Sequence, residues 1–140
     1  MSARDRIAPV FDLAPFIHLI GYKLVDAGEG WVETALTLEE RHLQQHGYAH
    51  AGVVTAMADH TAGGAASTVV QPGNSVLTAM LSIQLLRPAR GERLTCRGEV
   101  VKPGKRIIAT QADVHCDGKH VARLEATMAV VPVDIEATDG

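Results

Sequence analysis

The sequence predicts an α+β fold in which a curved antiparallel sheet wraps around one long central helix. The first observation is the segment from residue 51 to about 70, a run of small and apolar residues that would form a helix roughly 30 Å long. The second is a set of strand-like segments at residues 22–27, 31–38, 75–86, 92–102, 106–116 and 119–131. A sheet of five or six strands needs its apolar face covered, and only one long helix is available. We therefore expect the sheet to curve around that helix.

Length and composition narrow the class of protein. The 140 residues suit one domain covering residues 1–140, with loose termini at 1–10 and 134–140. A net charge of −3 and an aromatic content of 4% provide neither a basic field nor stacking faces, so we expect no nucleic-acid partner. Residues 1–20 hold no long apolar run, so we expect no signal peptide, no membrane span and a cytoplasmic location. Cys96 and Cys116 do not form a metal-ligand pair, and we expect no metal and no cofactor.

The elements outside the central helix have their own local signals. A short N-terminal helix is predicted at residues 14–20, because Asp12 can cap its start and Gly21 would stop it. Residues 39–49 have no apolar period and predict a polar loop leading into the central helix. Glycine-containing turn motifs separate the strands at residues 28–30, 103–104 and 117–118.

The central helix carries features that a plain structural helix does not need. Gly63 and Gly64 each cost about 1 kcal/mol relative to alanine, so we expect something to pack against this bare backbone. Asp59 lies among alanines, and a carboxylate in apolar surroundings has a raised pKa, which makes it a better general base. At the helix start, the unpaired N–H groups of Ala51 and Gly52 are suited to stabilise an oxyanion.

Four motifs in this order resemble the PaaI-type acyl-CoA thioesterases, whose fold is the hotdog fold. They are Gly47-x-x-His50-Ala51-Gly52, then Asp59 nine positions after the histidine with Gly63 following, then Leu81 to Ala89 with its Pro-Ala ending, and then Val101-Lys102-Pro103-Gly104-Lys105. The family pattern is Asn-x-x-Gly-x-x-His-Gly-Gly, followed by an acidic residue on the helix. Here Gln44 replaces the asparagine and Ala51 replaces the first glycine. The resemblance covers residues 14–131.

The resemblance implies hydrolysis of an acyl-CoA to the free acid and CoA. The acyl group would be small or medium in size, aryl groups included. Asp59 would act as general base, or as a nucleophile that forms a mixed anhydride. The Ala51 N–H, directly after the histidine, would be the leading oxyanion donor. Thr78 aligns with a position where related enzymes carry a hydroxyl that holds the attacking water, although threonine is also a common strand former.

The loop and the strand ends supply the remaining candidates. Gln44 would hydrogen-bond the water or the thioester carbonyl, with Gln45 as the alternative if the loop register shifts by one. His50 would order the loop and contact the thioester group. Cationic side chains near the turns would bind the phosphates of CoA, or would only protect a solvated strand edge; they are Arg87, Lys102, Lys105 and Arg106.

The resemblance also implies a homodimer or homotetramer with the site shared between subunits. Nine residues separate His50 from Asp59, which is about 900° of helical rotation and roughly 13 Å, so one helix would not bring both to one substrate. Asp59 of one chain would then face the helix start of its partner. Two alternatives on the same fold are a non-catalytic acyl-CoA sensor and, ranked below it, a hydratase or dehydratase.

Overall fold

The computed structural model describes residues 1–133, in which six strands form one antiparallel sheet with the order β1-β2-β4-β5-β6-β3. The strands are β1 (Lys23–Gly28), β2 (Trp31–Thr37), β3 (Asn74–Leu85), β4 (Arg93–Lys102), β5 (Ile107–Cys116) and β6 (Lys119–Pro132). The helices are α1 (Ala3–Asp12), α2 (Pro15–Ile20) and α3 (Ala51–Ser67), with a 3-10 turn η1 (Glu40–His42). All six predicted strands are confirmed to within one residue at each end, and α3 ends three residues before the expected boundary.

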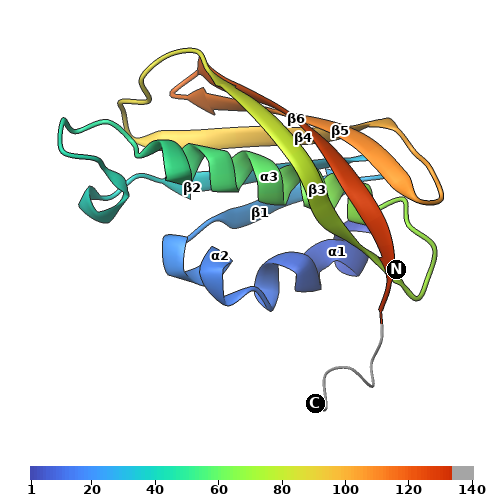
Figure 1. The fold of residues 1–140 in the computed structure, drawn as a ribbon. Coiled ribbons are helices and arrows are strands. Elements are labelled where there is room, and N and C mark those ends of the chain that lie inside the picture. Colours follow the sequence, from blue (N-terminus) through green and yellow to red (C-terminus); the bar gives the residue numbers. More distant parts are fainter. Residues whose placement is uncertain (134–140) are drawn as a thin grey trace, which may run out of the picture.

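The central helix α3 lies along one face of the sheet, which bends around it (Figure 1). It contacts every strand from β2 to β6. Its buried face carries Val53, Val54 and Met57, and the inward-facing side chains of the strands, such as Leu94 and Leu124, complete the core. The alternation of buried and half-exposed positions along β5 shows that only one face of the sheet is covered by the helix. This arrangement confirms the predicted fold class.

Glycines allow the helix and the sheet to approach closely. A Cβ atom on Gly98 of β4 would lie 2.8 Å from the carbonyl oxygen of Thr61 on α3. A Cβ on Gly64 would lie 3.1 Å from the Phe11 ring, so the expected packing against bare backbone is confirmed there. At Gly63 the expectation is wrong, because an added Cβ would have no neighbour within 4 Å.

The N-terminal residues form an ordered helix and are not the loose lead-in that their polarity suggested. Ser2 and Asp5 make a reciprocal capping box at the start of α1, and Ile7 and Phe11 bury their side chains against the rest of the core. Pro9 lies within α1 without ending it. Residues 134–140, expected to be a loose tail, lie outside the described residues.

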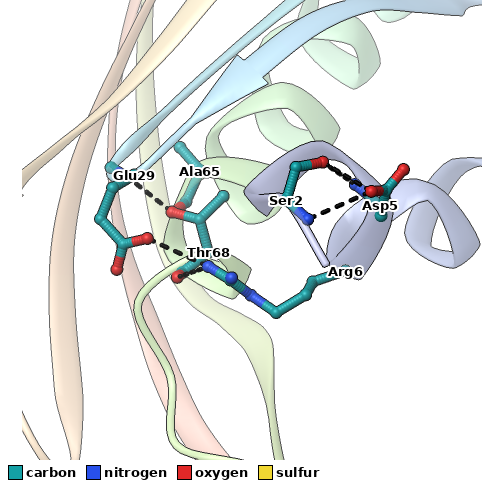
Figure 2. Close-up of polar contacts among 7 residues, drawn as sticks. Ser2, Asp5, Arg6, Glu29, Ala65 and Thr68 are labelled. Carbon is teal, nitrogen blue, oxygen red and sulfur yellow. Dashed lines mark hydrogen bonds and ion pairs between the residues drawn. The ribbon is translucent and has the colours of Figure 1, made fainter.

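Polar contacts fasten α1 to the far end of the central helix (Figure 2). Arg6 donates to the Glu29 carboxylate at 3.0 Å and to the carbonyl oxygen of Thr68 at 3.3 Å. The hydroxyl of Thr68 donates to the carbonyl oxygen of Ala65 and accepts from the N–H of Gly30. α1, the β1–β2 turn and the end of α3 are thus held as one unit.

The sheet ends at β3, whose outer edge has no strand beside it within residues 1–133. Large apolar side chains are exposed along this strand and just after it, and the most exposed are Leu77 and Met80, at 63% and 67%. An exposed apolar edge strand favours pairing with another chain. None of the helices in the described chain has the length and apolar character needed to cross a membrane.

Candidate active site

The first part of the candidate site is the carboxylate of Asp59, which lies half-exposed on α3 beside strand β3. The hydroxyl of Thr78 on β3 donates a hydrogen bond to Asp59 Oδ1 at 2.7 Å, which brings together two residues nineteen positions apart. β3 has a register irregularity directly after Thr78, of the kind that re-aims a side chain. Both residues border a cavity of about 200 Å³, together with Val10, Gly63 and Met128.

The second part is the start of α3, where one candidate oxyanion donor is occupied and the other is not. His50 is the N-cap, and its Nδ1 accepts a hydrogen bond from the Gly52 N–H at 2.8 Å. A Cβ on Gly52 would lie 3.0 Å from Nδ1, so a larger residue there would have to displace the His50 ring. Within residues 1–133 the N–H of Ala51 has no hydrogen-bond partner. The structure therefore leaves the Ala51 N–H free to bind a ligand and commits that of Gly52 to the cap.

Gln44 has one half of its side chain committed to the loop. Its Oε1 accepts hydrogen bonds from the N–H groups of His46 and Tyr48, at 2.6 and 3.2 Å. Since the oxygen serves the loop, the amide NH₂ of Gln44 is the end that can donate to a ligand. The backbone of the loop is itself anchored, because the Ala49 N–H donates to the carbonyl oxygen of Ala89 at 2.8 Å.

These loop and helix residues surround a cavity of about 530 Å³. Its walls include Gln44, Gln45, His50, Ala51 and Arg87, and the cavity also reaches Leu85 at the end of β3. Thr78 at the first cavity and Leu85 at the second are seven residues apart along one strand, roughly 23 Å. Within one chain the two groups of candidate residues therefore lie apart, in agreement with the separation expected from the helix geometry.

The histidines of this region differ in what they do. His42 is buried and structural, because its Nδ1 accepts from the Glu39 N–H and its Nε2 contacts the carbonyl oxygen of Ile20. His60 lies beside Asp59 in the chain, but its Nε2 contacts the carbonyl oxygen of Val10 at 2.8 Å. Burial lowers the pKa of His60 below its ordinary value of 6.5, which favours the neutral ring. His60 therefore holds α1 against α3.

The four cations expected at the CoA phosphates are not brought together within one chain. Arg87 borders the larger cavity beyond the end of β3 and donates to the carbonyl oxygen of His120 at 2.7 Å. Lys102, Lys105 and Arg106 lie at the β4–β5 turn, near the beginning of β3. The two groups are separated by the length of β3, roughly 36 Å.

Two residues at these cavities were missed by sequence reasoning. Val10 borders the Asp59 cavity from α1, and it was overlooked because residues 1–10 were expected to be loose. The Ser2-x-x-Asp5 capping box and the spacing of Ile7 and Phe11 were the signals that could have revealed α1. Tyr48 borders the larger cavity, and Arg90 lies over its ring at 5.8 Å, a contact with no signal in the sequence.

Comparison with known proteins finds relatives with the same fold. A thioesterase family protein from Silicibacter pomeroyi is 30% identical and superposes with a TM-score of 0.90, over 94% of this chain and 99% of that one. The Escherichia coli PaaI protein of the phenylacetic acid degradation operon shares the fold, with 20% identity and a TM-score of 0.83 over 92% and 93% of the two chains.

A third structure with this fold holds a ligand. It is a thioesterase protein from Streptococcus pneumoniae solved with coenzyme A, 24% identical with a TM-score of 0.73, over 80% of this chain and 87% of that one. The family model of the thioesterase superfamily matches residues 46–123, more than half of the chain, which include the α3 start, Asp59 and Thr78. The chain therefore belongs to the thioesterase superfamily, as a thioester hydrolase with the hotdog fold.

Proposed function

We propose that this protein hydrolyses small or medium acyl-CoA thioesters, aryl-type ones included, with Asp59 as the general base. The observation that carries the proposal is the hydrogen bond from Thr78 to Asp59 Oδ1, at the border of the cavity between the central helix and β3. With its hydrogen donated to the carboxylate, the Thr78 oxygen can accept a hydrogen bond from a water molecule. That water can give its second hydrogen to Asp59 as it attacks the thioester carbonyl. The C–S bond then breaks, and the CoA sulfur leaves as the thiol with the proton that Asp59 took.

The oxyanion that forms on the carbonyl is stabilised by the start of α3. The Ala51 N–H is free, and the positive end of the helix dipole lies behind it. The NH₂ of Gln44 is the second donor, because its oxygen is held by the loop. His50 contributes by occupying the Gly52 N–H, and its Nε2 then carries the proton and can donate to the substrate.

A complete site forms when two chains pair through their β3 edges. A two-fold axis near Leu81 and Ser82 places Thr78 opposite Leu85 of the partner subunit, because Thr78 lies three residues before Leu81 and Leu85 lies three residues after Ser82. Thr78 contacts Asp59, and Leu85 borders the cavity at the start of α3. The pairing therefore brings the base of one chain to the oxyanion donors of the other, and it buries the exposed apolar side chains of β3.

The same pairing unites the cations proposed to bind CoA. The carbonyl oxygen of Arg106 accepts a hydrogen bond from the N–H of Val130, and Val130 pairs with Val76 on β3. The proposed two-fold axis places Val76 opposite Arg87 of the partner subunit. Three strand spacings, about 14 Å, then separate the two groups of cations instead of the length of β3. Coenzyme A as the leaving group is supported by the related thioesterase fold solved with that ligand. A cytoplasmic location agrees with two buried cysteines that remain free thiols.

The deciding experiment is thiol release from a panel of short, medium and aryl acyl-CoA substrates. The protein should release CoA, and Asp59→Asn should lose roughly 10²–10⁴-fold in kcat because it removes the base while keeping size and the Thr78 contact. No turnover on any substrate would refute the thioesterase proposal. Full activity in Asp59→Asn would refute the role of Asp59 and leave the reaction class standing.

A further inference from the structure

Tyr22, directly before strand β1, is a buried residue that the proposed mechanism does not yet use. It is 5% exposed, and its hydroxyl donates a hydrogen bond to the carbonyl oxygen of Val53 at 2.5 Å. Val53 is the third residue of α3 and lies 31 positions away in the chain. Within residues 1–133, Tyr22 lines neither of the two cavities of the candidate site. Its polar contact is therefore with the backbone of the helix start and not with the space for a substrate.

The bond from Tyr22 is additional to the hydrogen bonds that a helix makes by itself. α3 continues past Met57, whose N–H is the α-helical partner of the Val53 carbonyl. Burial raises the pKa of Tyr22 and the nearby Met57 N–H lowers it by less, so the hydroxyl stays protonated and remains a donor. A phenylalanine would fill the same space at a lower desolvation cost and would leave the carbonyl its helical partner. Filling the core therefore does not explain the hydroxyl.

This hydroxyl fixes one side of the free Ala51 N–H, and the loop fixes the other. On the loop side, the His50 N–H donates to the carbonyl oxygen of His42 at 2.9 Å, and the ring of His42 contacts the carbonyl oxygen of Ile20 at 2.7 Å. On the helix side, the carbonyl that Tyr22 holds lies two residues from Ala51, about 3 Å along the axis. A side chain that enters the hydrogen-bond ladder of a helix bends the helix at that point. The direction of the first turn, and of the Ala51 N–H with it, therefore depends on Tyr22.

We propose that Tyr22 is a positioning residue, which aims the Ala51 N–H at the oxyanion by holding the carbonyl of Val53. The inference rests on the proposed thioesterase function and adds to its oxyanion site a residue that contacts no substrate. An oxyanion donor stabilises the transition state only when it points at the place where the charge develops. A misplacement of about 1 Å can cost roughly 10²-fold in rate, and the loss of one restraint among several moves the donor by less.

The test is a set of double-mutant cycles on thiol release from an acyl-CoA substrate. Tyr22→Phe should lower kcat roughly 10-fold and leave KM nearly unchanged, because the donor acts on the oxyanion and not on the bound substrate. The same factor should appear in Thr78→Val, which alters the other half of the proposed site. In Ala51→Pro, which deletes the N–H, Tyr22→Phe should cost nothing further, because no donor remains to be aimed. Equal losses in all three backgrounds, or no loss in the native one, would overturn the inference.

Thr61→Val is the matched control. It also removes a buried hydroxyl that donates to a carbonyl of α3, that of Met57, at 2.6 Å. This carbonyl lies one turn further from the helix start than that of Val53. Thr61→Val should therefore lower the melting temperature and leave kcat as in the native protein. An equal fall of kcat in Thr61→Val and Tyr22→Phe would indicate a general loss of packing and would overturn the positioning role.

Amide hydrogen exchange separates this inference from the proposed reaction. The N–H groups of Val53 and Val54 close the first turn of α3 on the carbonyl oxygen of His50. Tyr22→Phe should raise their exchange rates, and Thr61→Val should leave them as in the native protein. If the native protein hydrolyses no thioester, the proposed reaction fails on that result alone. Unchanged exchange at the first turn in Tyr22→Phe would instead overturn the role of Tyr22, whatever the reaction.

Discussion

The proposed oxyanion donor can be removed without disturbing the helix that carries it. Ala51 is the first residue of α3, the position where proline is best tolerated, because the N–H there has no partner within the helix. His50 has φ −58° and ψ 139°, a conformation that a residue before proline adopts readily. Ala51→Pro therefore deletes one N–H and keeps the backbone path.

The expected loss follows from the number of donors removed. One oxyanion donor contributes about 2.7–4 kcal/mol to the transition state, so kcat of Ala51→Pro should fall roughly 10²–10³-fold. Steady-state thiol release measures the loss, and circular dichroism with a melting curve establishes that the variant is folded. Ala51→Ser retains the N–H and should lose far less. A folded Ala51→Pro with the native kcat would refute the assignment of the oxyanion donor to Ala51.

The same variant tests whether the site is shared between two chains. Ala51→Pro and Asp59→Asn damage different halves, so in a mixed dimer one of the two sites has both halves intact. Random exchange of equal amounts makes half of the dimers mixed, and the mixture should recover about one quarter of the native activity. Activity that stays at the level of the separate variants, after exchange has been verified by mass spectrometry, would place the whole site within one chain.

Two further predictions concern stability. Gly98→Ala should lower the free energy of unfolding by about 1–3 kcal/mol or more, because its Cβ would lie 2.8 Å from the Thr61 carbonyl oxygen and push the helix off the sheet. Denaturant unfolding measures this change, and a change near zero would contradict the close approach. His60 should make stability fall as pH drops below 6.5, since burial lowers its pKa and the unfolded chain then binds more protons than the folded one. His60→Gln, which keeps a donor for Val10, should show a weaker fall in melting temperature between pH 7 and pH 5, and equal falls would exclude His60 as the cause.

The secondary structure was largely readable from the sequence because its signals are local. These signals depend only on neighbours a few positions away. They include the alternation of apolar and polar residues at 107–116 and the turn motifs at 103–104 and 117–118, and the strands lie where they were expected. α1 was missed because its polar composition masks two buried side chains, Ile7 and Phe11. Their burial depends on contacts with α3 and the sheet, which are distant in the sequence. The helix-to-sheet contact was also decided by a pair distant in the chain, Gly98 and Thr61.

The motifs identified the candidate residues, but they did not show which of these residues contact one another. The sequence named the Ala51 and Gly52 N–H groups as donors, with Ala51 as the leading one. The direction of the His50 ring commits the Gly52 N–H to the helix cap and leaves that of Ala51 free. Sequence placed Asp59 and Thr78 nineteen residues apart, and only the packing of α3 against β3 joins them. The spacing along the helix predicted that the proposed base and the proposed donors of one chain act on different substrates. The edge that we propose for pairing two chains follows from where the sheet ends, and that is a property of the folded chain.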